Sequence, residues 1–294
     1  PATPAEPFPS ALRKATDAPP VAGPPPPAVD LVVEELSWQG QRIGRLELDA
    51  NARSGPLRSG PREWRVARLV LVTPEARLQA QGPWRATAEG HDAGGALDFK
   101  MDIADTGRLL ERVLQQRSIR GGKGVLQGSV HWRGSPLWPD FASMGGRMNL
   151  ALESGQFLRV EPGAGRLLGV LSLQALPRRL MLDFRDVFQE GFAFDSITGD
   201  VTIDSGIART TNLTMRGIQA VVVMDGHADL QRETQDLRVV VVPEINAGTA
   251  SLAYAAINPT VAVGTFLAQL FLRGPLAAAG TREFQVTGSW SDPQ

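Results

Sequence analysis

Residues 199–204 read Gly199-Asp200-Val201-Thr202-Ile203-Asp204, and this alternation of polar and apolar side chains decides the fold. Successive residues of a β-strand point to opposite faces, so Val201 and Ile203 share one face and the polar side chains share the other. The alternation continues through residues 192–242, with short Gly-containing gaps at 205–206 and 217. Gaps of this length join antiparallel neighbours. The segment therefore predicts a long antiparallel sheet with one dry face and one wet face.

Similar runs on both sides of this segment predict further strands. The clearest lies at 97–103, where four apolar residues alternate with Asp98, Lys100 and Asp102. Residues 239–242 are four consecutive valines, which predicts a strand covered on both faces. Strands are expected at 45–50, 64–71, 76–80, 97–103, 125–132, 148–152, 180–184, 192–242 and 284–290.

Two short helices and one uncharged segment interrupt the strand pattern. Asp105 is placed to cap a helix that ends near Gln116, because apolar residues follow it at helical spacing. A second helix is expected at 166–176, ended by Pro177. The segment Asn246–Leu272 contains no charged residue, and its Ala, Gly and Leu content favours helix.

The uncharged segment has three interpretations, which the sequence leaves open. It is long enough for a transmembrane helix, it suits two helices packed on the sheet, and it suits a hairpin lying in a membrane interface. If it meets a membrane, the side chains expected to do so are Leu252, Ile257, Phe266, Leu270 and Phe271.

The fold class that we predict is mainly β: an open, strongly twisted or curved antiparallel sheet of repeated strand units, with a few short helices and a C-terminal apolar helical segment. The organisation along the chain has three parts. Residues 1–28 are rich in Pro and form a linker or surface strap. Residues 30–164 carry repeated strand units with the first helix, and residues 165–294 carry the remainder.

Composition narrows the function. The 294 residues have a net charge of −1, so no overall positive field favours nucleic acid. There is no cysteine, which excludes disulfides and zinc–thiolate sites. The chain lacks an initiator Met and a signal-type apolar region, and we therefore expect it to be a piece of a larger protein.

The search for catalytic and cofactor-binding motifs yields no convincing site. His91, His131 and His227 are far apart and lack metal-ligand spacing, so we interpret them as solvated side chains. Residues 120–124, Arg-Gly-Gly-Lys-Gly, fail the phosphate-loop pattern and favour a hairpin turn. No GxSxG elbow is present. We predict a protein that is not an enzyme and needs no metal or other cofactor.

Two stretches resemble a known family. Residues 165–204 include Gly165-Arg166-Leu167-Leu168-Gly169-Val170 and Gly191-Phe192-Ala193-Phe194-Asp195-Ser196, and the chain closes with Val286-Thr287-Gly288-Ser289-Trp290 before Asp292-Pro293. Both are similar to the C-terminal region of AsmA-like envelope proteins of the YhdP type. The resemblance is specific over 165–294 and looser over 30–164, and residues 1–28 stand outside it.

The resemblance implies a fold, a place and a function. Members are anchored in the inner membrane of Gram-negative bacteria by a helix that would lie outside this chain. Their antiparallel strands form a curved trough across the periplasm, with an apolar inside. They are implicated in moving phospholipids toward the outer membrane and in envelope integrity. The chain is then expected to be a non-enzymatic lipid conduit with phospholipids, both membranes and other envelope proteins as partners.

The dry face supplies the expected lipid contacts. For each lining residue the alternative is ordinary protein core, and for the whole chain it is a structural or protein-interaction module without a groove. Arg178 and Arg179 are expected either to meet anionic head groups or to be a solvated pair. The candidate lining residues are Leu182, Phe184, Val201, Ile203, Leu213, Met215, Val221, Val223, Val239 and Val241.

Overall fold

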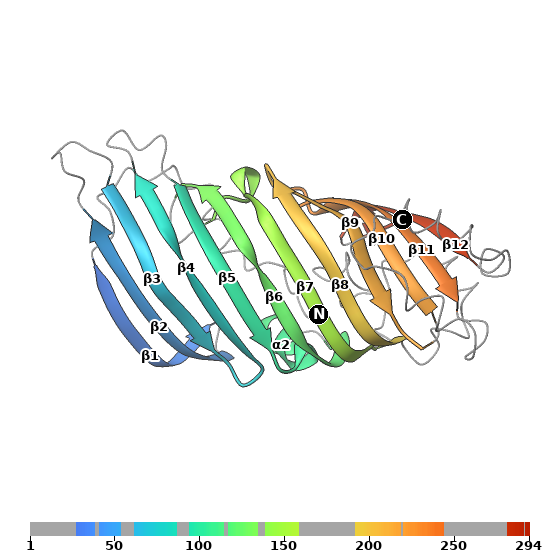
Figure 1. Cartoon of the computed structure of the whole chain (residues 1–294), viewed down its shortest axis with the longest axis horizontal. Helices are drawn as coiled ribbons and strands as arrows, with labels where there is room; N and C mark the ends of the chain where they lie inside the picture. Colours follow the sequence, from blue (N-terminus) through green and yellow to red (C-terminus); the bar gives the residue numbers. More distant parts are fainter. Residues whose placement is uncertain are drawn as a thin grey trace, which may run out of the picture. The chain divides into compact units, whose positions relative to one another are not determined.

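The computed structural model describes residues 28–38, 41–53, 62–86, 94–114, 117–134, 139–158, 192–218, 220–243, 281–290 and 292–294. In these residues nearly every regular element is a β-strand (Figure 1). The strands are β1 (Val29–Trp38), β2 (Gln41–Arg53), β3 (Arg62–Val72), β4 (Ala76–Ala86), β5 (Gly94–Ile103), β6 (Ile119–Arg133), β7 (Gly145–Phe157), β8 (Phe192–Asp204), β9 (Ile207–Arg216), β10 (Ala220–Asp229), β11 (Thr234–Pro243), β12 (Arg282–Ser289) and β13 (Asp292–Pro293).

The strands form one antiparallel sheet in which each strand is hydrogen-bonded to the next along the chain, from β1 to β13. Where the connection is short, as between β8 and β9, the order follows from its length, because a two- to four-residue link returns the chain beside the strand that it has just left. The Ser205-Gly206 link between β8 and β9 is an example: both residues have positive φ angles, 50° and 76°. The prediction of an open antiparallel sheet is confirmed.

One helix, α2 (Thr106–Leu114), and a single 3-10 turn, η1 (Phe141–Ser143), accompany the strands in the described residues. Asp105 caps α2 as expected: its carboxylate accepts a hydrogen bond from the Arg108 backbone N–H at 3.0 Å. No helix among the described residues has the length and apolar character needed to cross a membrane. The helix expected at 166–176, the segment 246–272, and the boundary expected after residue 164 all lie outside the described residues.

The chain packs as two compact units, each assembled from separate stretches of sequence. The first unit contains β1 to β4, most of β5, and the parts of β6 and β7 at residues 127–147. The second contains α2, the remaining parts of β6 and β7, and the strands from β9 onward, with β8 up to Thr202.

The first unit has its core at one end of β2, β3 and β4. Ala50, Trp64, Val66 and Trp84 form a buried cluster there. Trp64 and Trp84 face each other across β3 and β4, and the Trp84 indole N–H donates to the Gly134 carbonyl at 2.7 Å. The cluster joins three strands, and the indole hydrogen bond ties it to the end of β6.

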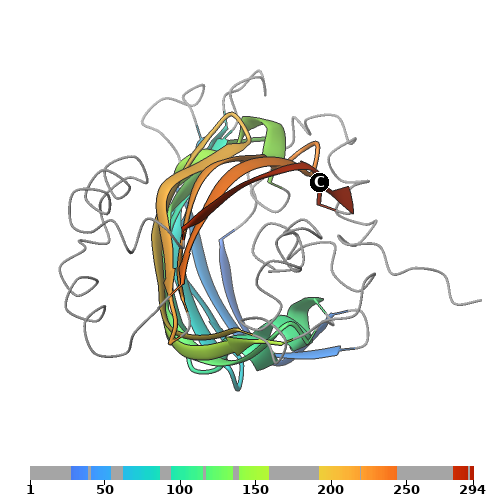
Figure 2. The same cartoon turned by 90° about the vertical axis from the view of Figure 1, so that its right-hand side faces the viewer.

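The second unit has its most deeply buried residues on β10 and β11. Val239, Val240, Val241 and Val242 are each at most 1% exposed, so both faces of β11 are covered there. The prediction made from the four valines is confirmed. The long strands of this unit curve along their own length (orange in Figure 2). A register shift between β9 and β10 lies beside Gly226, and such bulges bend a strand.

One local expectation is wrong. Residues 120–124 do not make a hairpin turn but run within β6, where Lys123 lies 3.7 Å from Glu153 in an ion pair. Gly121 and Gly122 have φ angles of 65° and 83°, which glycine tolerates, so the strand continues through an irregularity. A Gly-rich run alone does not distinguish a turn from an irregular strand.

Candidate functional site

The strand registers place a continuous set of apolar side chains on one face of the second unit. Met215 pairs with Val222, and Val222 with Val241. Residues that pair directly across antiparallel strands point to the same side, so each such row contributes to one face. We call this set the apolar face of the second unit; it comprises Leu213, Met215, Val222, Met224, Leu237, Val239, Val241, Phe284 and Val286.

Strand β8 adds to the same face through a close approach. A Cβ placed on Gly199 would lie 2.8 Å from Cδ1 of Leu213, so Gly199 faces the Leu213 side chain. Alternation then puts Val201 on the side of Leu213. Of the predicted lining residues, Val201, Leu213, Met215, Val239 and Val241 therefore share one face of the second unit, whereas Ile203 belongs to the first unit, where it is 7% exposed.

Val221 and Val223 do not belong to this face. Val221 pairs with Arg216 and Val242, and Val223 pairs with Thr214 and Val240, all of which point to the opposite side. The expectation that they line the same surface as Leu213 is wrong. Residues 220–224 are apolar at five consecutive positions, so alternation alone cannot show which face each side chain occupies. The register places Val222 and Met224, instead of Val221 and Val223, on the face of Leu213.

The apolar face of the second unit is deeply buried. Met215, Val222, Val239 and Val241 are at most 2% exposed, and Leu213 is 8% exposed. Val201 is half-buried. The remaining nine candidate positions lie outside the described residues: Arg178, Arg179, Leu182, Phe184, Leu252, Ile257, Phe266, Leu270 and Phe271.

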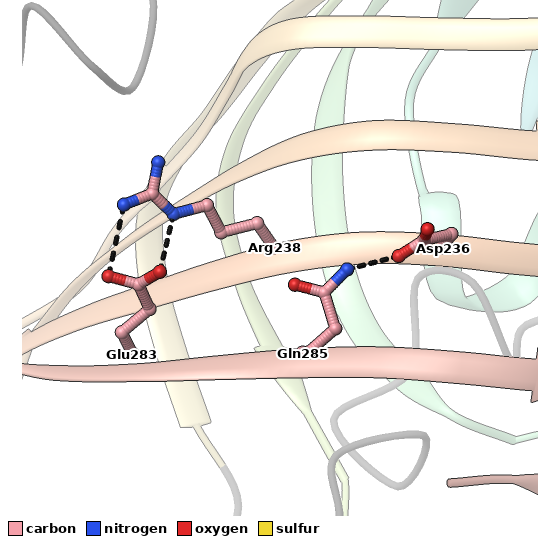
Figure 3. A network of polar contacts seen from close by, with 4 residues as sticks. All are labelled: Asp236, Arg238, Glu283 and Gln285. Atoms are coloured by element: carbon pink, nitrogen blue, oxygen red, sulfur yellow. Dashed lines mark hydrogen bonds and ion pairs between the residues drawn. The ribbon is translucent and has the colours of Figure 1, made fainter.

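The opposite face of the second unit carries charged side chains in paired arrangements (Figure 3). The Arg238 guanidinium donates to both carboxylate oxygens of Glu283, at 2.6 and 3.0 Å, and Gln285 donates to Asp236. The hydrogen bonds from Arg238 lower the pKa of Glu283. Burial raises the pKa of the neighbouring Asp225 carboxyl. The paired charges occupy only part of this face, because Val221, Val223, Val240 and Val242 lie on the same side and are at most 7% exposed.

A second polar group on this face is centred on Asp200. The Asn149 and Asn212 amides donate to its two carboxylate oxygens at 2.9 and 2.8 Å, and they lower the pKa of Asp200. The carboxylate of Asp200 is thus a structural acceptor. Among the described residues, no three His, Cys, Asp or Glu side chains are grouped as metal ligands would be, and His131 and His227 are exposed.

The first unit also has an apolar face, which the sequence analysis did not single out. Leu46 pairs with Leu71, and Leu71 with Leu78; Leu48 pairs with Leu31 and Leu69. These side chains are only half-buried, and Leu31 is 41% exposed. The signal was present in the alternation at 45–50. The apolar face of the first unit comprises Leu31, Leu46, Leu48, Leu69, Leu71 and Leu78.

The other face of the first unit is charged. Glu47 pairs in register with Val70 and so points away from the leucines, and its carboxylate lies 2.9 Å from Arg68. This unit thus presents half-buried leucines on one side and ion pairs on the other, so part of its apolar surface remains accessible. Surfaces of this kind take part in binding.

Comparison with known proteins agrees with this geometry. A family model described as YhdP protein matches residues 9–294. The protein named intermembrane phospholipid transporter YhdP of Escherichia coli (strain K12) is 30% identical over 277 residues, which cover 91% of this chain and 20% of that protein. The chain thus spans about a fifth of the length of this relative. No solved structure matches. Because the family match begins at residue 9, the expectation that residues 1–28 stand outside the resemblance is wrong.

Proposed function

Because the chain belongs to the YhdP protein family, we propose that it is a non-enzymatic part of a conduit that moves phospholipids between the inner and outer membranes. The relative from Escherichia coli carries the name of an intermembrane phospholipid transporter. In this proposal the apolar faces of the two units hold acyl chains, and the charged faces remain in water.

The observation that carries the proposal is that several consecutive strands of each unit place apolar side chains in register on one face. Burial of each lipid methylene contributes about 0.8 kcal/mol, so one acyl chain along such a face supplies ample driving force. The attraction is non-directional, so a lipid can move along the face without a fixed catalytic or binding residue.

The half-exposed leucines make the first unit the principal lipid surface of the proposal. Leu46, Leu48 and Leu71 retain accessible area that an acyl chain would cover. In the second unit Met215, Val239 and Val241 are already buried, so lipid contact there requires their present cover to move aside. Val201 and Leu213 remain lining candidates on the same face, and Ile203 remains a lining candidate in the first unit.

The wider setting is also part of the proposal. We place the chain in the periplasm of a Gram-negative bacterium, as part of a protein anchored in the inner membrane, with its sheet curved as a trough. Arg178 and Arg179 are proposed to meet head groups. The segment 246–272 is proposed to be the part of the chain nearest a membrane.

Site-specific photocrosslinking tests the proposal. Leu48 and Asp49 are neighbours on β2 that point to opposite faces, so benzoylphenylalanine at the two positions forms a matched pair. We expect phospholipid adducts, identified by mass spectrometry, at position 48 and none at position 49. Equal labelling, or protein adducts alone at position 48, would instead favour a structural or protein-interaction module.

A further inference from the structure

Gln235 carries an amide on the same side of β11 as the apolar face of the second unit. It is two residues before Leu237, and its register partners Ala228 and Gly288 are small. The residue is 4% exposed, and within the part of the chain that the structure describes neither its Nε2 nor its Oε1 has a hydrogen-bond partner. A primary amide is thus buried without compensation in an apolar setting.

Trp290 supplies a second unpaired group close by. Its indole N–H has no partner although the residue is 7% exposed. The Trp290 backbone N–H donates to the Glu233 carbonyl at 2.8 Å, which sets Trp290 opposite Glu233 and diagonal to Gln235. Diagonal neighbours on adjacent strands are within reach of long side chains.

These unpaired groups need a physical reason, because buried polar atoms nearly always find a partner. A leucine at position 235 would fill similar space at no such cost. The two residues together present two donor nitrogens, Gln235 Nε2 with two N–H groups and Trp290 Nε1 with one, and one acceptor, Gln235 Oε1. A ligand that lies on the apolar face and carries oxygen atoms would satisfy the donors.

We propose that Gln235 and Trp290 form a polar clamp that binds the ester carbonyl oxygens of a glycerolipid whose acyl chains lie along the apolar face of the second unit. The inference rests on the proposed function. It adds a specific binding site to a face along which a lipid otherwise moves without a fixed binding residue. A diacyl lipid has two ester carbonyls, which matches the two donors. Gln235 Oε1 is then available to a hydroxyl or ammonium hydrogen of the head group.

Charge favours the ester carbonyl over the phosphate. A buried phosphate requires a cation, and the side chains in register with Gln235 are those of Ala228 and Gly288. Arg238 points to the opposite face, and Arg282 pairs with Val241 near the other end of β11. Neutral donors beside an apolar surface suit the junction of acyl chain and glycerol, where the ester groups lie.

A comparison of diester and diether phospholipids with the same head group and chain lengths tests the clamp. Both lipids have acyl or alkyl chains of equal length, and only the diester has carbonyl oxygens. We expect the chain to retain the diester lipid more tightly by about five-fold for each hydrogen bond, measured by competition and native mass spectrometry. Gln235→Leu should abolish most of this preference while still binding both lipids.

Gln285→Leu is the matched control, because Gln285 is exposed on the opposite face of β12. It should leave the preference unchanged. Gln235→Leu should melt no lower than the parent, since it removes unpaired buried groups; Trp290→Phe provides a second variant, which should reduce the preference in part. Loss of preference in both clamp variants, with the control unaffected, supports the clamp.

Two other results overturn it in distinguishable ways. Equal retention of diester and diether lipid by the parent, or a preference that persists in both clamp variants, overturns the clamp and leaves the lipid conduit standing. Retention of neither lipid overturns the conduit and the clamp together.

Discussion

Asp200 shows how one side chain on the wet face is held in place. Asn212 Nδ2 donates to its carboxylate, and the Asp200 backbone N–H donates back to Asn212 Oδ1 at 2.9 Å. Asn149 donates to the other carboxylate oxygen. Because these hydrogen bonds favour the charged form, the pKa of Asp200 is lower in the folded chain than in the unfolded chain. Its contribution to stability is therefore present above the unfolded pKa, about 3.9, and is lost as the pH falls through the folded value.

Asn212→Ala tests this arrangement. We expect the free energy of unfolding to fall by about 1 to 2 kcal/mol at pH 7, because the variant removes hydrogen bonds to a charged group. The difference from the parent should shrink below about pH 4 as Asp200 becomes protonated. Urea unfolding between pH 7 and pH 3 measures both effects.

Asn51→Ala is the control, since Asn51 donates to Asp49 in an exposed pair and its loss should cost less than about 0.5 kcal/mol. If the difference in the free energy of unfolding between Asn212→Ala and the parent stayed constant over the whole pH range, it would contradict the role assigned to Asp200.

The alternation of Asp200 with Val201 was sufficient to predict from the sequence that Asp200 lies on the wet face. It could not show the amide partners. Asn149 is 51 positions away along the chain, and only the pairing of the folded strands brings it to Asp200. The pair Gln235 and Trp290 was missed for the same reason, because it depends on the register of β11 against β12.

Whole strands were more predictable than the faces of their side chains. The strand expected at 97–103 lies within β5, and Asp105 caps α2 as expected. For β10 the face was wrong, since the five apolar residues from Ala220 to Met224 contain no polar residue to mark the wet side. A shift of one residue reverses every side chain of a strand, so only the pairing resolves such a run.

Gly226 lies at a position of β10 where the backbone conformation and the neighbouring strand leave no room for a side chain. Its φ angle is 139°, and a Cβ there would lie 2.2 Å from the Asp236 carbonyl oxygen of the neighbouring strand. We expect Gly226→Ala to lower the free energy of unfolding by about 2 to 4 kcal/mol, because backbone atoms of a paired strand cannot move aside freely.

Gly134→Ala is the matched control for this prediction. Gly134 also has a positive φ angle, 93°, but a Cβ there would meet nothing within 4 Å. The control should cost only about 1 kcal/mol, for the backbone conformation alone. Equal losses in the two variants, measured by urea unfolding, would show that the close approach at Gly226 has no separate effect.

Each of the two units has an apolar face, and the two faces differ in how far they are covered. The second unit buries its valines almost completely, whereas the first leaves Leu46, Leu48 and Leu71 half-buried. Alternation in the sequence predicted the separation of faces. It could not predict the coverage, because coverage depends on what packs over each strand and not on the strand alone. The lipid surface that we propose therefore lies mainly on the first unit.

The central claim is that the apolar faces hold phospholipid, and the most direct measurement is mass spectrometry of lipids extracted from the chain purified without detergent. Leu71 and Val72 are adjacent, half-buried residues of β3 that point to opposite faces, so Leu71→Asp and Val72→Asp form a matched pair. Circular dichroism and thermal unfolding serve as the control that both variants are folded. We predict phospholipid on the parent and on Val72→Asp, and a strong reduction on Leu71→Asp. A parent without phospholipid, or equal amounts on the two folded variants, would contradict the account.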